Sequence, residues 1–327
     1  MIRGTNESFF KFEDVEEWKA ALDKEGFAVL RGVLSKKDVD HATGSLWTSL
    51  ERLGSGLNRK DPATWTNEAW PGWKQVGFLQ TNGLCQSEAA WYVRSHPNVV
   101  KAFAEIWGTE DLITSLDVII AWRPWKKQPS RRPRVERLHV DQNAYAKRGK
   151  VCVQGMVVLE DVTVETGGLQ VVPGTNTDEV QSYLRRTYPH LASEPNSDWC
   201  ELDENDPFIG KGELLLAKAG DLILWDSRTI HAGYVGPGSD DESKLSRLAM
   251  TVCMIPQDKV NPKVLEMRMS AFQLGKCLTH WPGEYREHST FGTIFDAPPF
   301  VPPQLTGAQL RLLAGAQSKD GQQCSLQ

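Results

Sequence analysis

The apolar positions in the first part of the chain recur at helical spacing. Over residues 11–25 they fall three and four positions apart, which predicts an amphipathic helix. A short strand is expected next, at Phe27–Leu30. Ser35 with Asp38 three positions later forms a capping pattern, and it predicts a second helix that runs toward Leu53.

Residues 54–74 separate this region from the next helical one. They are rich in Gly, Asn, Pro and Trp, which indicates a long loop, and long ordered loops are often functional. Residues 86–107 regain helical spacing, with a break expected near Pro97. The first 110 residues are therefore expected to be mainly helical.

The pattern changes after about residue 112. Apolar runs become short and β-branched, and Gly, Pro, Asn and Asp separate them. The predicted strands are Leu112–Trp122, Val151–Leu159, Leu169–Val172, Glu213–Leu216, Asp221–Trp225 and Leu248–Ile255. Many short strands with turn signals favour a sandwich or jelly roll, so the fold class is expected to be mainly β.

We expect one catalytic domain over residues 1–327. Its jelly-roll core is assigned to residues 111–256, with an insertion at 178–208 that is helical at Glu179–Arg186. Residues 257–327 form a C-terminal extension with a Pro-rich turn, a short helix at Thr306–Ala314 and a polar end that is expected to fray.

Composition narrows the classes of protein. Of the 327 residues 40% are hydrophobic, so a packed core is expected, and the net charge of −5 argues against a nucleic-acid binder. Six scattered cysteines without a C-x-x-C pair fit neither a structural zinc site nor a disulfide framework. The N-terminal residues are acidic where a signal peptide is apolar, and no stretch suits a membrane span. We expect a cytoplasmic protein, a monomer or homodimer, that acts on a small molecule.

The most informative residues are two histidines and an aspartate. In a strand, residues two apart project to the same face, so His139 and Asp141 can offer one imidazole and one carboxylate to a single ion. His231 is expected to add a second imidazole at the end of the strand that precedes it. This ligand set leaves half of an octahedral coordination sphere open and is typical of non-haem iron(II) oxygenases.

A lone His-x-Asp pair is common on protein surfaces, so its weight comes from the motifs around it. Arg247 opens an otherwise apolar strand, and its planar guanidinium suits a carboxylate such as the distal one of 2-oxoglutarate. Without the other motifs, a strand-end arginine that reaches solvent is as good an explanation. Two turn-and-strand patterns keep the order that a jelly roll requires, Glu165–Thr175 and Gly220–Asp226.

Together these motifs resemble the phytanoyl-CoA dioxygenase family of iron(II)- and 2-oxoglutarate-dependent oxygenases, from about Phe12 to Ile255. The matching segments are Glu25–Leu34, His139–Asp141, Val158–Val162, Gly167–Thr175, Ala219–Ser227, His231 and Arg247. The resemblance implies a double-stranded β-helix of cupin-like form with helical N- and C-terminal embellishments. It also implies Fe(II) on the three ligands, 2-oxoglutarate and O2 as co-substrates, and ascorbate as an optional reductant.

The reaction implied is hydroxylation of a small organic substrate, with release of succinate and CO2. Related halogenases replace the carboxylate ligand with a small residue, and Asp141 is retained here. Two alternatives stay open. One is a non-catalytic module that binds metal and 2-oxoglutarate; the other is a cupin-like metal enzyme that does not use 2-oxoglutarate.

The chain departs from the family pattern near the co-substrate. Residues 236–243 lengthen the hairpin before Arg247, which makes that arginine the best candidate of its region. Gly233 stands where a serine hydroxyl often helps to bind the co-substrate. Gln154, polar within an apolar run, is expected either to replace that contact or to be an ordinary structural amide.

Substrate contacts are the least determined feature. The candidates are Trp70, Trp73, Phe78, Gln142 and Arg137. The basic run at residues 126–137 is expected to be a solvated loop, or else a loop at the mouth of the site that attracts an anionic substrate such as a coenzyme A thioester.

Overall fold

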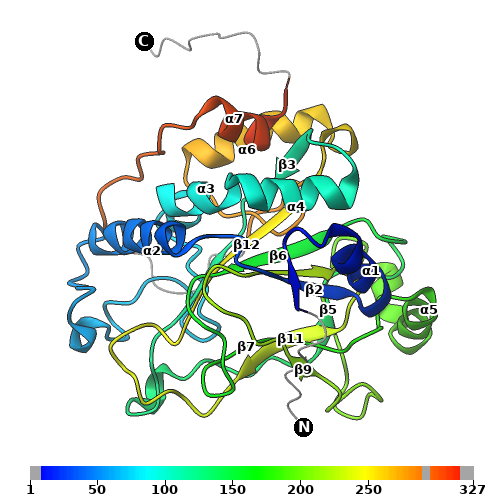
Figure 1. The fold of residues 1–327 in the computed structure, drawn as a ribbon, viewed down its shortest axis with the longest axis horizontal. Coiled ribbons are helices and arrows are strands. Elements are labelled where there is room, and N and C mark those ends of the chain that lie inside the picture. Colours follow the sequence, from blue (N-terminus) through cyan, green and yellow to red (C-terminus); the bar gives the residue numbers. More distant parts are fainter. Residues whose placement is uncertain (1–8, 289–294, 317–327) are drawn as a thin grey trace.

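Two β-sheets face each other in this computed structural model, which describes residues 9–288 and 295–316 (Figure 1). The larger sheet has the order β1-β2-β10-β6-β12-β3, with β4 also paired to β12. Its strands are β1 (Phe9–Lys11), β2 (Phe27–Arg31), β3 (Leu112–Thr114), β4 (Ile119–Trp122), β6 (Val153–Val158), β10 (Leu222–Asp226) and β12 (Arg247–Pro256). These strands pair antiparallel, apart from the parallel pair β1 and β2.

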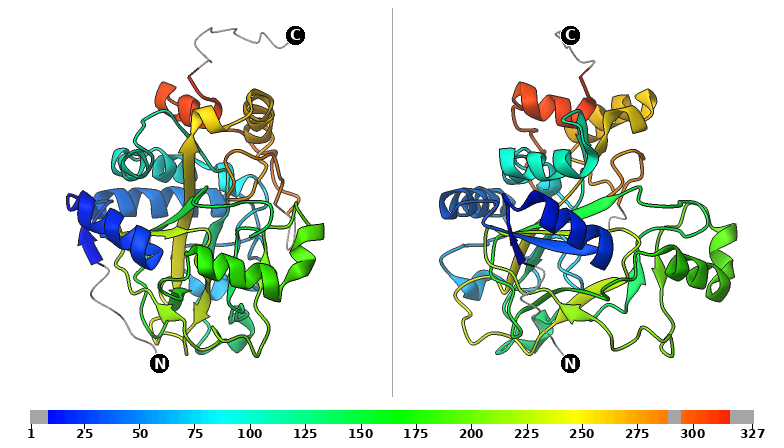
Figure 2. Two further views of the ribbon diagram at one scale, coloured as in Figure 1. Left: turned by 90° about the vertical axis from the view of Figure 1, so that its right-hand side faces the viewer. Right: turned by 45° about the vertical axis from the view of Figure 1, so that its right-hand side comes forward.

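The smaller sheet has the order β8-β5-β11-β7-β9, with antiparallel pairing throughout. Its strands are β5 (His139–Val140), β7 (Gly167–Val171), β8 (Cys200–Glu201), β9 (Glu213–Leu214) and β11 (His231–Val235). The two sheets form the jelly roll that the strand pattern predicted, and β12 is the long strand that runs from the helices into the barrel (Figure 2).

Helices flank the two sheets, most of them on the outer side of the larger one, whereas Asp178–Thr187 packs against the smaller sheet. The helices are α1 (Val15–Glu25), α2 (Lys36–Glu51), α3 (Glu88–Arg94), α4 (Pro97–Trp107), α5 (Asp178–Thr187), α6 (Pro262–Gln273) and α7 (Gly307–Ala314). In Figure 1, α3 and α4 lie between the sheets and the outer pair α6 and α7. Among the described helices, none combines the length and the hydropathy that crossing a bilayer requires.

Alternation along the larger sheet separates two cores. Leu222 and Leu224 of β10 pack in the cluster beneath the helices, whereas Ile223 and Trp225 pack in the cluster between the sheets. Because both faces are covered, the strands read as unbroken apolar runs without a polar face. The same alternation turns Arg247, which opens β12, toward the inside of the barrel, where it lines the cavity.

The N-terminal predictions agree with the structure in type and differ at the start of the first helix. The capping box of Ser35 and Asp38 is present at the start of α2, and the break near Pro97 separates α3 from α4. The first helix, predicted from residue 11, begins at Val15, because Phe9–Lys11 pairs with β2 as a strand. Residues whose spacing is compatible with a helix therefore adopt an extended backbone here, because they pair with β2.

Two features of the later chain differ from expectation. His231 was placed at the end of a strand; it begins β11, after a turn that follows β10. Helix α6 was not predicted, although Asn261 caps it and Pro262 opens it, which is a recognisable start signal. The expected frayed end beyond residue 316 lies outside the described residues. Five cysteines are unpaired, and Cys324 also lies outside that range.

Candidate metal centre

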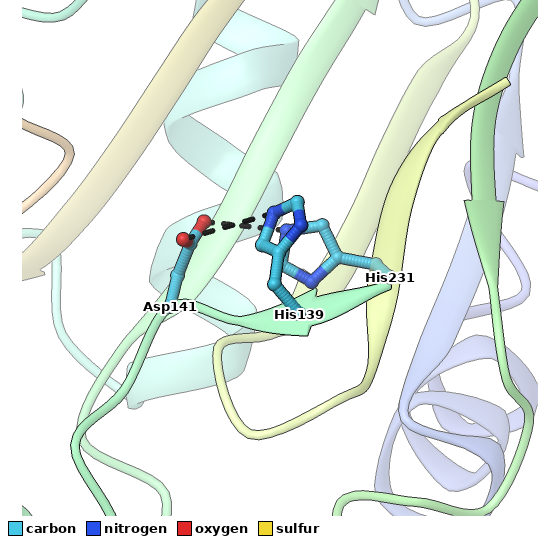
Figure 3. A group of neighbouring side chains, drawn as sticks. All are labelled: His139, Asp141 and His231. Carbon is cyan, nitrogen blue, oxygen red and sulfur yellow. Dashed lines mark ion pairs between the residues drawn. The ribbon is translucent and has the colours of Figure 1, made fainter. Parts of the chain in front are cut away.

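The pairing of two short strands brings the two histidines together. In the register of β5 and β11, His139 stands directly opposite His231, and the ring centroids are 4.5 Å apart. Asp141 follows the last residue of β5, and its carboxylate turns back toward both rings (Figure 3). The ligand atoms of the three residues all lie within 4.8 Å of one another. Side chains ninety residues apart thus converge on one point.

Each imidazole presents the same nitrogen to that point. Nδ1 of His139 lies 2.8 Å from the carbonyl oxygen of Arg137, and Nδ1 of His231 lies 2.9 Å from that of Thr229. A carbonyl oxygen only accepts, so each Nδ1 carries the proton and each Nε2 keeps its lone pair. Both Nε2 atoms face Asp141, at 3.9 Å from His139 and 3.2 Å from His231. The arrangement presets the tautomer that binds a metal.

The charges within the triad also suit a cation. Burial, with the neighbouring His231, lowers the pKa of His139 to about 4. Burial is the largest single influence on His231 and would lower its pKa, but the hydrogen bond and the charge of Asp141, together with the Thr229 carbonyl, raise it overall. Burial would raise the pKa of Asp141, yet the two imidazoles hold it well below its usual range. Asp141 is therefore a carboxylate at neutral pH.

Two side chains support the triad. Gln154 of β6 donates a hydrogen bond from Nε2 to Oδ2 of Asp141 at 3.1 Å, so its amide contacts the carboxylate ligand directly. Trp199 stacks on the ring of His139, with centroids 3.8 Å apart and planes 25° apart. These contacts restrict how the carboxylate and one imidazole can turn.

Arg247 lies buried on the opposite sheet, and among the described residues it forms no ion pair with a carboxylate. Its guanidinium stands 4.4 Å over the ring of Trp122, and Nη2 contacts the sulfur of Met156 at 3.4 Å. Its Nε is buried without a hydrogen-bond partner, and burial lowers its pKa to about 10, so it stays charged. A buried guanidinium with an N–H that lacks a hydrogen-bond acceptor is a site that an anion would complete.

Glu136 is the site residue that the sequence did not indicate. It is partly buried, lines the same cavity, and burial raises its pKa while the charge of Arg247 lowers it. A Cβ built on Gly233 would lie 3.0 Å from its Oε2, so this carboxylate takes the space beside the glycine. No motif marks it; only the approach of residue 136 to β11 does.

One cavity of about 740 Å³ joins these groups. It is lined by the triad, Gln154, Gly233, Arg247 and, among the predicted substrate contacts, Phe78. The other four substrate candidates are not in its lining. Trp70 lies in the core and Trp73 packs on Phe78; Gln142 donates to the carbonyls of Lys147 and Gly149, and Arg137 pairs with Glu201.

The basic run before β5 is docked onto the protein. Lys126 pairs with Asp240 at 2.9 Å, and the backbone N–H of Lys127 donates to Glu242. Arg131 is buried, and Arg132 donates to the carbonyl of Val235. The backbone of the run is therefore held by neighbouring segments, whereas the side chains of Lys126, Lys127 and Arg132 remain exposed.

The donor set fits Fe(II) and 2-oxoglutarate. Two imidazoles and one carboxylate on one side of a common point are the ligands that such iron sites use, and no thiolate of the described chain lines the cavity. The unpartnered Nε of Arg247 fits the second carboxylate of a dicarboxylic acid.

Comparisons with known proteins agree with this geometry. The model of the phytanoyl-CoA dioxygenase family matches residues 22–235, which is more than half of the chain and includes the whole triad. The match stops at residue 235, so it includes neither the lengthened hairpin at residues 236–243 nor Arg247. Ava biosynthesis cluster protein O of Aspergillus versicolor is 27% identical over 295 residues, 83% of this chain and 87% of that protein.

A solved structure shares the fold. A hypothetical protein from Escherichia coli superposes on 94% of this chain and 84% of its own, with a TM-score of 0.58 and 15% identity. The epimerase SnoN, in complex with Fe3+, alpha ketoglutarate and nogalamycin RO, covers 74% of this chain and 84% of its own, with a TM-score of 0.49 and 16% identity.

Proposed function

Because the chain belongs to the phytanoyl-CoA dioxygenase family, we propose that it is an iron(II)- and 2-oxoglutarate-dependent oxygenase that hydroxylates a small organic substrate. The observation that carries the proposal is the shared cavity, which joins a preset His-Asp-His triad to a buried arginine without an anion. Either feature alone has ordinary structural explanations. Both in one cavity match the two ligands that this chemistry needs.

The bound iron and 2-oxoglutarate supply the oxidation: O2 gives one oxygen atom to succinate and one to the new hydroxyl group, and CO2 leaves. The chain positions these groups. His139, Asp141 and His231 hold the metal, Gln154 orients the carboxylate of Asp141, and Arg247 binds the far carboxylate of the co-substrate. The apolar wall of the barrel excludes water from the reacting atoms.

The first experiment asks whether the site binds both ligands. Full-length protein, iron(II) and 2-oxoglutarate are mixed without O2, and the visible metal-to-ligand band is recorded. We expect a band that disappears in His139→Ala and His231→Ala, because each loses one of three ligands. With O2 admitted, slow succinate formation should follow. A band without succinate would indicate the non-catalytic module, and the absence of both would indicate a metal enzyme that does not use 2-oxoglutarate.

Arg247 separates this proposal from a cupin-like enzyme that does not use 2-oxoglutarate. Arg247→Met keeps the apolar stem and removes the charge, so we expect 2-oxoglutarate affinity to fall roughly 100-fold, the scale of a lost charged hydrogen-bond pair. Arg59→Met is the matched control, because Arg59 pairs with Glu51 and does not line the cavity. Equal 2-oxoglutarate affinity in Arg247→Met and the control would contradict the assignment.

A further inference from the structure

Three consecutive residues of the C-terminal extension line the same cavity as the triad. They are Thr279, His280 and Trp281. Each has one buried polar atom without a hydrogen-bond partner among the described residues: Oγ1, Nε2 and Nε1 respectively. Buried polar atoms are nearly always paired in folded proteins, so three in a row at a cavity wall need an explanation.

The unpaired atoms do not reflect a loose segment. The backbone N–H of Leu278 donates to Leu116 at 2.8 Å, and that of Thr279 donates to Arg286 at 3.0 Å. Trp281 packs with Cys152 and Cys253 in a buried cluster. The segment is therefore held in place by its backbone at Leu278 and Thr279 and by the packing of Trp281.

An ion-pair network fixes this segment against the insertion that faces it. Asp198 accepts from Lys147 at 2.7 Å and from Arg286 at 3.1 Å, and Glu284 pairs with the same two cations at 2.8 Å. The ammonium of Lys147 also lies 4.0 Å from the ring centroid of Trp281. Asp198 precedes the tryptophan that stacks on His139, so the network ties the wall to the metal site.

The charges of the cavity disfavour an anionic substrate. Arg247 and Arg286 are the arginines of the described lining, and that lining includes no lysine. Arg286 is already paired with two carboxylates, and Arg247 is assigned to the co-substrate. The lining also carries four acids besides the metal ligand, Asp117, Glu136, Glu194 and Asp198. An added anion would meet like charges without a free cation.

Most of the remaining wall is apolar. It includes Phe78, Val118, Ile120, Trp122, Met156 and Leu169. With about 740 Å³ of space, the cavity is in the size range of pockets that enclose a drug-sized molecule. An indole N–H can only donate a hydrogen bond, and a hydroxyl or imidazole can donate one as well. The three unpaired groups together suit acceptor oxygen atoms.

Resting on the proposed function, we infer that Thr279–Trp281 is the substrate-recognition wall of this enzyme. It selects an uncharged, largely apolar molecule that carries carbonyl or other acceptor oxygens. The anionic substrate that the basic run suggested is not favoured by this cavity. A substrate acceptor would complete the hydrogen bonding that the wall lacks, and the apolar side would bury its carbon skeleton.

The test uses two probes of one shape. Biphenyl-4-carboxamide and biphenyl-4-carboxylate both carry acceptor oxygens and differ in charge. Their affinities for the full-length protein, loaded with iron(II) and 2-oxoglutarate without O2, are measured by ligand-observed NMR titration. We expect the carboxamide to bind at least roughly tenfold more tightly than the carboxylate. Equal or tighter binding of the carboxylate, or no binding of either probe, would overturn the inference.

Trp281→Phe then removes the indole N–H and keeps an aromatic ring. We expect carboxamide affinity to fall about five- to tenfold, with the 2-oxoglutarate band unchanged. Trp107→Phe is the matched control: its indole donates to the carbonyl of Met254 and lies outside the cavity lining, so its carboxamide affinity should equal wild type. Equal carboxamide affinities in the two variants would contradict a recognition role.

The same samples separate this inference from the proposed function. If the carboxamide binds in a Trp281-dependent way and the iron band never forms, the recognition wall stands and the oxygenase assignment fails. If the band forms normally and Trp281→Phe binds the carboxamide as the wild type does, the oxygenase stands and the recognition wall fails. Thermal unfolding of both variants identifies any loss that comes from misfolding.

Discussion

Gln154→Leu isolates the support of the carboxylate ligand from the ligand itself. The amide of Gln154 donates to Oδ2 of Asp141 at 3.1 Å, and the side chain is 5% exposed, so solvent cannot replace the donor easily. Leucine nearly preserves the shape and cannot donate. Asp141, His139 and His231 remain, but the carboxylate is free to turn away from the metal position.

The size of the effect follows from that one bond. A hydrogen bond to a charged acceptor contributes about 1.5–3 kcal/mol, and about 1.4 kcal/mol corresponds to tenfold in affinity. Losses of this kind around metal ligands are typically about 10- to 100-fold. We therefore expect Gln154→Leu to bind iron(II) roughly 10- to 100-fold more weakly, and to retain the fold.

The assay is an anaerobic titration of the apo-protein with iron(II) in the presence of 2-oxoglutarate, with thermal unfolding in parallel. Gln86→Leu is the matched control, because Gln86 is also a buried amide, donates to the carbonyl of Lys276 at 2.8 Å, and does not line the cavity. It should lower stability and leave iron affinity unchanged.

The reasoning is refuted if Gln154→Leu binds iron(II) as tightly as the wild type at equal stability. It is also refuted if the control loses as much affinity as Gln154→Leu, since the loss would then report general damage to the fold. Glutamate at position 154 sharpens the contrast: a second carboxylate beside Asp141 should change the pH dependence of binding, which leucine should not.

Three further predictions concern the same site. Glu136→Gln removes a negative charge beside Arg247, so 2-oxoglutarate should bind more tightly. The expected gain in affinity is on the order of tenfold, which corresponds to one pKa unit of interaction. Weaker binding of 2-oxoglutarate in a titration would contradict this prediction. Asp141→Ala should abolish hydroxylation of any substrate identified, as measured by product mass; full turnover without the carboxylate would exclude it as a ligand. Removing the metal with a chelator should lower the melting temperature. Iron(II) at one hundred times its dissociation constant adds about 2.7 kcal/mol to the free energy of unfolding, so the expected decrease is on the order of 4 °C. An unchanged melting curve would mean that the folded state does not bind the metal.

Local pattern was sufficient for much of the fold. The change from helical spacing to short β-branched runs predicted the jelly roll, and the capping box at Ser35 and Asp38 marked a helix start that the structure contains. The boundaries that differ, such as the start of α1, depend on pairing with a strand far along the chain. Spacing carries no information about such a partner.

Local pattern also identified the chemical types at the centre. His139 and Asp141 stand two positions apart, and any extended backbone brings such side chains to one side. Arg247 stood out because a charge within an apolar strand needs a reason. These inferences depend on residue identity and on short-range geometry, which the chain itself supplies, and the structure brings these three side chains and His231 to one cavity.

The surroundings of the site were decided by tertiary structure alone. Glu136, Trp199 and Trp281 carry no motif. Trp199 and Trp281 line the cavity because the insertion and the C-terminal extension fold back over the barrel, and Glu136 does so because the segment before β5 approaches β11. Trp70 and Trp73, which looked like pocket walls, pack elsewhere. Contacts between segments far apart depend on the packing of the whole molecule, so a side chain's type predicts what it can bind but not what it will face.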